Sequence, residues 1–179
     1  DINSDGQPAL IEGNDQSPNR IYWGAIKQKS SSLFRRSQNL SEGSLRTRSI
    51  SVGDLNKDGL PDLIVGNKDD ADKVFVNNID GSGLGLKATI GGESSPTVSV
   101  VLGDVDGDGD LDVLRGLYGQ TSLCHLNDGA GGFSSDRPTD AVVHNTTSFV
   151  LGDFDSDGDV DLAEGIYGER NRLHINSTE

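Results

Sequence analysis

The sequence is poor in the residues that would crosslink a small protein or hold it in a membrane. Its single cysteine, Cys124, excludes an internal disulfide framework. No apolar run approaches the roughly 20 residues of a membrane-spanning helix, and no signal peptide is recognisable. We therefore expect no membrane insertion and no stabilisation by disulfides.

Basic residues are also scarce. The 15 Lys and Arg residues are outnumbered by 29 Asp and Glu residues, which gives a formal charge of −14. An acidic surface repels nucleic acids and anionic lipids, so we expect neither as a partner. Many of the acidic residues are concentrated in four short windows of the sequence. This clustering indicates cation-binding loops rather than an evenly solvated acidic surface.

The sequence contains side chains that can act in catalysis, but they do not form a recognisable catalytic motif. We find no nucleophile paired with a base, no phosphate-binding loop and no redox pair. His125 and His174 occupy a repeated position that elsewhere holds Tyr22 and Phe75, which favours packing over chemistry. Cys124 aligns with apolar residues and is expected to be a small buried side chain. We predict that the protein is not an enzyme.

The most informative stretch is 104–112, which reads Asp-Val-Asp-Gly-Asp-Gly-Asp-Leu-Asp. Carboxylates at loop positions 1, 3, 5 and 9 can converge on one point only if the chain turns sharply between them. Gly109, at position 6, permits that turn because glycine adopts positive φ without a Cβ clash. Position 7, Asp110, would offer its backbone carbonyl. The pattern predicts a loop that binds a hard cation.

The pattern recurs along the chain. Complete copies begin at Asp54 and Asp153, and an incomplete copy begins at Asp1 and has Ala9 at its ninth position. The four first residues, 1, 54, 104 and 153, are separated by 53, 50 and 49 residues. A fixed period near 50 indicates a repeat architecture.

Each period also has the same arrangement of apolar runs. An alternating run enters the loop, a short run leaves it, a third run follows, and a weaker polar run closes the period; the closing runs are near 33–34, 86–89 and 133–134. Four strands per unit of about 40–50 residues is typical of a propeller blade. We predict an all-β fold, a β-propeller segment of four-stranded antiparallel blades. It contains about three and a half to four blades, and it forms a single domain over 1–179 with repeats at about 1–45, 46–95, 96–144 and 145–179.

These residues resemble the FG-GAP/VCBS repeat, which builds the seven-bladed propeller of integrin α subunits and related fungal lectins. The resemblance rests on 103–114 and its relatives at 53–64 and 152–163. It implies three calcium sites, whose ligands would be Asp54, Asn56, Asp58, Leu60 and Asp62; Asp104, Asp106, Asp108, Asp110 and Asp112; and Asp153, Asp155, Asp157, Asp159 and Asp161. Leu60, Asp110 and Asp159 would contribute backbone carbonyls. The first loop departs from the pattern, so Asp1, Asn3, Asp5 and Gln7 form at most a weak fourth site. The resemblance also implies a larger ring, of seven blades in the usual case.

Two other interpretations of the loops are open. Segments 1–12 and 153–164 fit the twelve-residue EF-hand pattern with a terminal Glu. The equivalent positions in the other loops are Val65 and Arg115, and strands rather than helices flank the loops. Solvated Asp-rich turns without metal are the second alternative, which the mutual repulsion of clustered carboxylates disfavours. Zinc would require His or Cys, and the loops contain neither.

Calcium is favoured over magnesium because each loop offers about six or seven flexible oxygens. Millimolar extracellular calcium suits sites of modest affinity, so we expect a secreted or cell-surface protein. Its expected function is a non-catalytic scaffold for adhesion or recognition, with an extracellular protein or glycan as partner.

Two alternative functions are a lectin with sites between blades and a non-catalytic accessory domain of a larger secreted enzyme. The candidate stacking groups of a lectin are Tyr22, Trp23, Tyr118 and Tyr167. Apolar blade faces at both ends would allow self-association. Since the chain starts inside a loop motif, we expect a mature or excised part of a longer protein.

Overall fold

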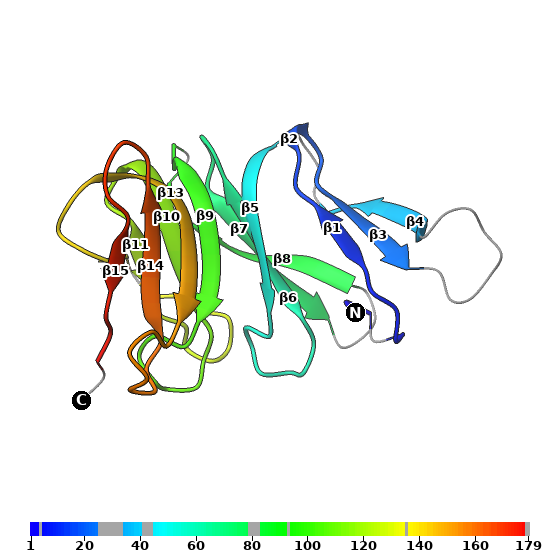
Figure 1. Ribbon diagram of the computed structural model, residues 1–179. Helices are drawn as coiled ribbons and strands as arrows, with labels where there is room; N and C mark the ends of the chain where they lie inside the picture. The colour runs from blue at the N-terminus through cyan, green and yellow to red at the C-terminus, as the bar shows by residue number, and fades with distance from the viewer. Residues whose placement is uncertain are drawn as a thin grey trace.

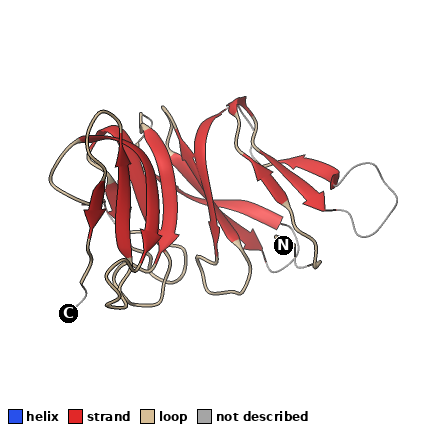
Figure 2. Ribbon diagram, viewed as in Figure 1, coloured by secondary structure: helices blue, strands red, loops and turns tan. Residues whose placement is uncertain are grey.

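A computed structural model describes residues 1–3, 5–24, 34–40, 45–78, 83–92, 94–134 and 136–177. Among these residues all regular structure is β, as Figure 2 shows, and the strand pairs are antiparallel. The described part of the chain contains no helix long and apolar enough to cross a membrane. The curled sheets follow one another as blades of a partial β-propeller, which confirms the predicted fold class.

The first blade contains β1 (Leu10–Glu12), β3 (Arg20–Gly24) and β4 (Phe34–Asn39), paired in that order. The second contains β5 (Leu45–Gly53), β6 (Asp62–Asn67), β7 (Asp72–Asn78) and β8 (Gly83–Ile90). β5 and β6 form a hairpin whose register pairs Gly53 with Asp62. The acidic loop at 54–61 is therefore the connection of this hairpin, as the sequence predicts.

The third blade contains β9 (Thr97–Gly103), β10 (Asp112–Gln120), β11 (Leu123–His125) and β12 (Arg137–Pro138). The predicted position of its outer strand, near Phe133, is wrong, because β12 pairs with β11 four residues later. Phe133 makes only an isolated bridge to Asn127, and its ring packs against the core between the second and third blades. Phe133 thus lies against the interblade core, outside the edge strand.

The fourth blade contains β13 (His144–Gly152), β14 (Asp161–Ile166) and β15 (Arg172–His174). In Figure 1 the blades succeed one another from the blue N-terminal sheet to the red C-terminal one. The hairpin loops after β5, β9 and β13 lie along the same lower edge in this view. The repeat thus places its acidic loops on one rim.

Short antiparallel contacts join each blade to the next. The strand β2 (Asp15–Ser17), which the sequence analysis missed, pairs with β5 and links the first two blades. A single bridge from Lys68 to Pro96 links the second and third, and the end of β10 pairs with β13 to link the third and fourth. These contacts provide hydrogen-bond partners for backbone N–H and C=O groups at the blade boundaries that would otherwise be unpaired.

The core lies between blades, so β6 is buried on both faces. Leu63 and Val65 contact the first blade, whereas Ile64, one residue between them, contacts the third. Successive side chains of a strand point to opposite faces, which is why one strand contributes to two core clusters. Burying each such aliphatic side chain contributes about 1.5–3 kcal/mol.

Candidate metal centre

The first acid of each loop holds the turn in place. The Asp104 carboxylate accepts hydrogen bonds from the backbone N–H groups of Gly107 and Gly109, at 2.8 and 2.9 Å. Asp54, Asp153 and Asp1 accept equivalent bonds in their own loops. The loop conformation is therefore encoded locally, and it recurs in the loop at 1–9 as well.

Two positions of the loop require positive φ. Gly109, at position 6, has a φ of 84°, as its predicted role in the turn requires. Position 4 was missed by the sequence analysis: its φ is 77° at Gly107, 57° at Lys57 and 66° at Ser156. Gly107 was the one residue whose identity hinted at this constraint, because Lys and Ser adopt the left-handed region at a cost.

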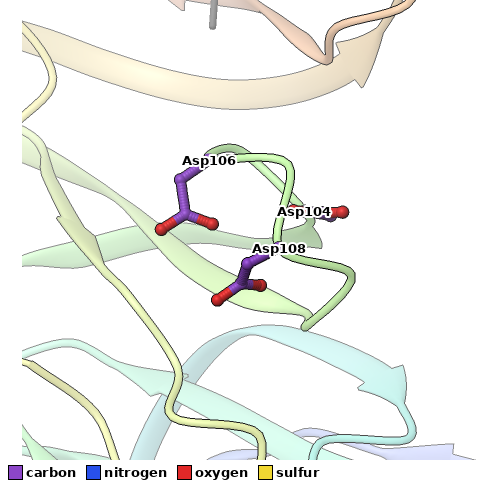
Figure 3. A group of neighbouring side chains, drawn as sticks. All are labelled: Asp104, Asp106 and Asp108. Carbon is purple, nitrogen blue, oxygen red and sulfur yellow. The ribbon is translucent and has the colours of Figure 1, made fainter.

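Three acids of the loop at 104–112 lie close enough to share an ion. Asp104, Asp106 and Asp108 each offer a carboxylate oxygen, and these oxygens all lie within 4.8 Å of one another (Figure 3). Two oxygens on opposite sides of one Ca²⁺, each about 2.4 Å from it, are separated by about 4.8 Å. The donor set consists of oxygen, which hard cations prefer. The loop could therefore hold a hard metal cation.

The last loop gathers a different set of acids. Oxygens of Asp153, Asp155 and Asp161 lie within 4.8 Å of one another. Desolvation, followed by repulsion from Asp157 and Asp161, raises the pKa of Asp155. Asp157 accepts the N–H of Asp159 at 2.9 Å, just as Asp108 accepts that of Asp110 at 2.8 Å. Like charges held this close favour either a proton or a cation among them.

The ninth-position acids have a role that the sequence analysis missed. Asp112 is fully buried, and its two oxygens accept the N–H groups of Val105 in the loop and Asn127 at the end of the third run. Asp62 and Asp161 make the same pair of bonds. Burial raises the pKa of Asp62 and Asp112. Each oxygen has a second lone pair, so these bonds leave capacity for a cation.

Asparagine at position 3 changes the balance of charge within a loop. The Asn56 amide nitrogen donates to Asp58 at 3.0 Å, and Asn3 donates to Asp5 at 2.9 Å. Both loops thus contain a donor that satisfies one acid without a metal, whereas Asp106 and Asp155 add a further charge at this position. A bound cation would therefore relieve more repulsion in the loops at 104–112 and 153–161 than in the other two.

A lysine side chain of the second blade contacts the acidic loop of the third blade. Lys57 forms an ion pair with Asp110, and the hydrogen bond to Asp110 raises the pKa of Lys57. Asp108 and Asp104 add to this effect through their charges. No sequence signal predicted the contact, because it joins loops 53 residues apart in sequence across a blade boundary.

A profile of the FG-GAP-like repeat matches residues 1–65 and 54–115. The chain belongs to the FG-GAP-like repeat family. The predicted resemblance is thereby confirmed, and the loops at 1–9, 54–62 and 104–112 lie within the matched residues. The loop at 153–161 follows them and repeats the same backbone hydrogen bonds. A comparison with curated proteins finds no match.

Proposed function

We propose that this FG-GAP-like chain is a calcium-binding, non-catalytic scaffold for extracellular adhesion or recognition. The observation that carries the proposal is the convergence of Asp104, Asp106 and Asp108 within 4.8 Å on a hairpin loop. Hairpin loops of the same kind lie along one rim. The ligand, an extracellular protein or a glycan, would bind the framework that these loops stabilise.

Calcium would stabilise the inner hairpin of each blade. Without a cation, the loop at 104–112 holds several carboxylates in mutual repulsion; with one, it becomes a rigid corner between β9 and β10. At a calcium concentration a hundredfold above the Kd, binding stabilises the fold by about 2.7 kcal/mol per site. Millimolar extracellular calcium would fill sites of modest affinity, whereas cytosolic calcium would not.

Calorimetry with calcium and with a chelator tests this proposal. We expect the melting temperature to fall on chelation. Asp106→Asn should reduce that fall, because Asn already occupies the equivalent position at Asn3 and Asn56 and the substitution removes one ligand charge. Glu169→Gln, which removes one charge from a half-exposed side chain outside the loops, is the matched control. An unchanged melting temperature after calcium removal would refute the proposal.

One observation favours a lectin as the second candidate. Tyr118 and Tyr167 are 47% and 68% exposed, and both lie beside Asn145, which pairs with Tyr118 and accepts the N–H of Tyr167. Exposed aromatic rings on neighbouring blades could stack on sugars. Glycan-array binding that disappears in the Tyr118→Ala/Tyr167→Ala variant would favour this candidate.

A further inference from the structure

In the second, third and fourth blades, an asparagine at the end of the third run reaches back to the preceding blade. The side-chain nitrogen of Asn127 donates to the carbonyl of Leu55 at 2.8 Å, and that of Asn176 donates to the carbonyl of Val105 at 2.8 Å. Asn77 makes the same bond to Ile2. In every case the acceptor is the second residue of the preceding acidic loop, so the contact recurs at three blade boundaries.

The same second residues of the loops also bind the ninth-position acids, through their backbone N–H groups. The N–H of Val105 donates to Asp112, and the backbone N–H of Asn127 donates to the other oxygen of Asp112. A continuous line of hydrogen bonds therefore crosses two blade boundaries. It runs in the order Asp62, Leu55, Asn127, Asp112, Val105, Asn176 and Asp161.

The line passes between candidate ligands. Val105 separates Asp104 from Asp106, so the orientation of the two peptide groups that flank its Cα directs two of the three clustered acids. Asn127 uses all of its side-chain capacity here: its nitrogen also donates to Leu111, and its oxygen accepts the N–H groups of Gly129 and Gly131. An apolar side chain would fill the same volume, but it would leave these groups unpaired.

We propose that these asparagines are positioning residues that couple neighbouring calcium loops, so that an ion bound in one loop favours binding in the next. This inference rests on the proposed calcium binding. The physical basis is that the second residue of a loop, such as Val105, donates its N–H to the ninth-position acid of its own loop and accepts the asparagine of the following blade at its carbonyl. Ordering this residue for one site therefore also orders its bond to the other. Coupling of this kind is reciprocal between the two sites.

Asn176→Ala provides a selective test. Alanine keeps the backbone N–H that binds Asp161 and removes only the bond to Val105, 71 residues away in sequence. The backbone amide NMR signals of Gly109 and Gly158 report on the two loops, because each N–H binds the first acid of its loop. We expect the calcium midpoint at Gly109 to rise about three- to tenfold, and the cooperativity between the two signals to fall.

Asn171→Ala is the matched control, because Asn171 lies in the same blade and its side-chain oxygen accepts the N–H of Ile166, a residue of that blade. It should leave the Gly109 curve unchanged. If Asn176→Ala leaves that curve unchanged while the wild type binds calcium, the coupling is refuted and the proposed function stands. If the wild type shows no calcium response, the proposed function fails instead.

A measurement in chelator tests the positioning role without metal. Amide exchange at Gly109 should be faster in Asn176→Ala than in the wild type, whereas exchange at Gly59, whose loop receives its bond from Asn127, should not change. Equal exchange at Gly109 in the two proteins would contradict the proposal. Should the alanine variant fail to fold, Asn176→Ser, which keeps a shorter donor, allows the same two measurements.

Discussion

A buried ion pair joins the second and third blades, and its removal should have a large effect on stability. Arg115 is 1% exposed and donates from Nε to an oxygen of Asp72, which is fully buried, at 2.6 Å. The guanidinium also donates to Ser95 and Thr97. Asp72 accepts, in addition, the backbone N–H of Asn67 and the hydroxyl of Thr97. The side chains of Arg115, Asp72 and Thr97 therefore hydrogen-bond to one another inside the protein.

Replacing Arg115 by Leu would leave the Asp72 carboxylate buried without its cation. Breaking a buried pair in this way costs about 3–5 kcal/mol. For a chain of this length each kcal/mol corresponds to about 2–4 °C, so we expect the melting temperature to fall by about 6–20 °C. Arg46→Leu, which breaks ion pairs of a 38% exposed arginine, should cost less than about 1 kcal/mol.

Urea unfolding of four proteins gives the measurement: the wild type, Arg115→Leu, Asp72→Asn and the double variant. Asparagine retains an acceptor for the Asn67 N–H, so the double variant should lose less than the sum of the single losses, with a coupling of about 2 kcal/mol or more. If Arg115→Leu costs no more than Arg46→Leu, or if the two single losses add, this reasoning about the buried pair is wrong.

Two further predictions concern pH. Burial raises the pKa of the Cys124 thiol to about 11. The rate of its alkylation at pH 8 should therefore be roughly a hundredfold lower than that of a free thiol, and the rate should keep rising above pH 9. A rate that reaches a plateau near pH 9 would contradict this prediction. The second prediction concerns Asp112 in the presence of chelator. Because its pKa is raised in the folded protein, the folded protein binds more protons than the unfolded chain between pH 3.8 and that raised pKa. The stability that Asp112 contributes should therefore fall as the pH rises through this range. Urea unfolding of the wild type and of Asp112→Asn at pH 4 and pH 7 isolates this effect. The free energy of unfolding of the wild type relative to the variant should be lower at pH 7 than at pH 4, and a higher value at pH 7 would refute the prediction.

Local spacing made most of the strands and loops predictable. An alternating apolar run identified the strand that enters each complete loop, and a short apolar run identified the strand that leaves it. The acids with Gly109 identified the turn. Both are properties of a few consecutive residues. The exceptions were β2, whose sequence Asp-Gln-Ser has no apolar alternation, and the outer strand of the third blade, where Phe133 is drawn into the core.

The contacts between blades were not predictable in this way. Arg115 aligns with Val65 and Glu164, so nothing in the repeat indicated that it would meet Asp72, 43 residues earlier. Asn127 stands at the same repeat position as Asn77 and Asn176, but only the stacking of the blades shows that its acceptor is Leu55.

The sequence by itself determined the period, the antiparallel blades and the acidic loops, because hydrogen bonds and apolar alternation within a short segment specify them. Only the tertiary structure decided which loop each side chain reaches, because neighbouring blades bring together residues some 50 to 70 positions apart. Lys57 with Asp110 and Asn176 with Val105 are examples. Such pairings depend on the stacking of whole sheets, which no short segment encodes.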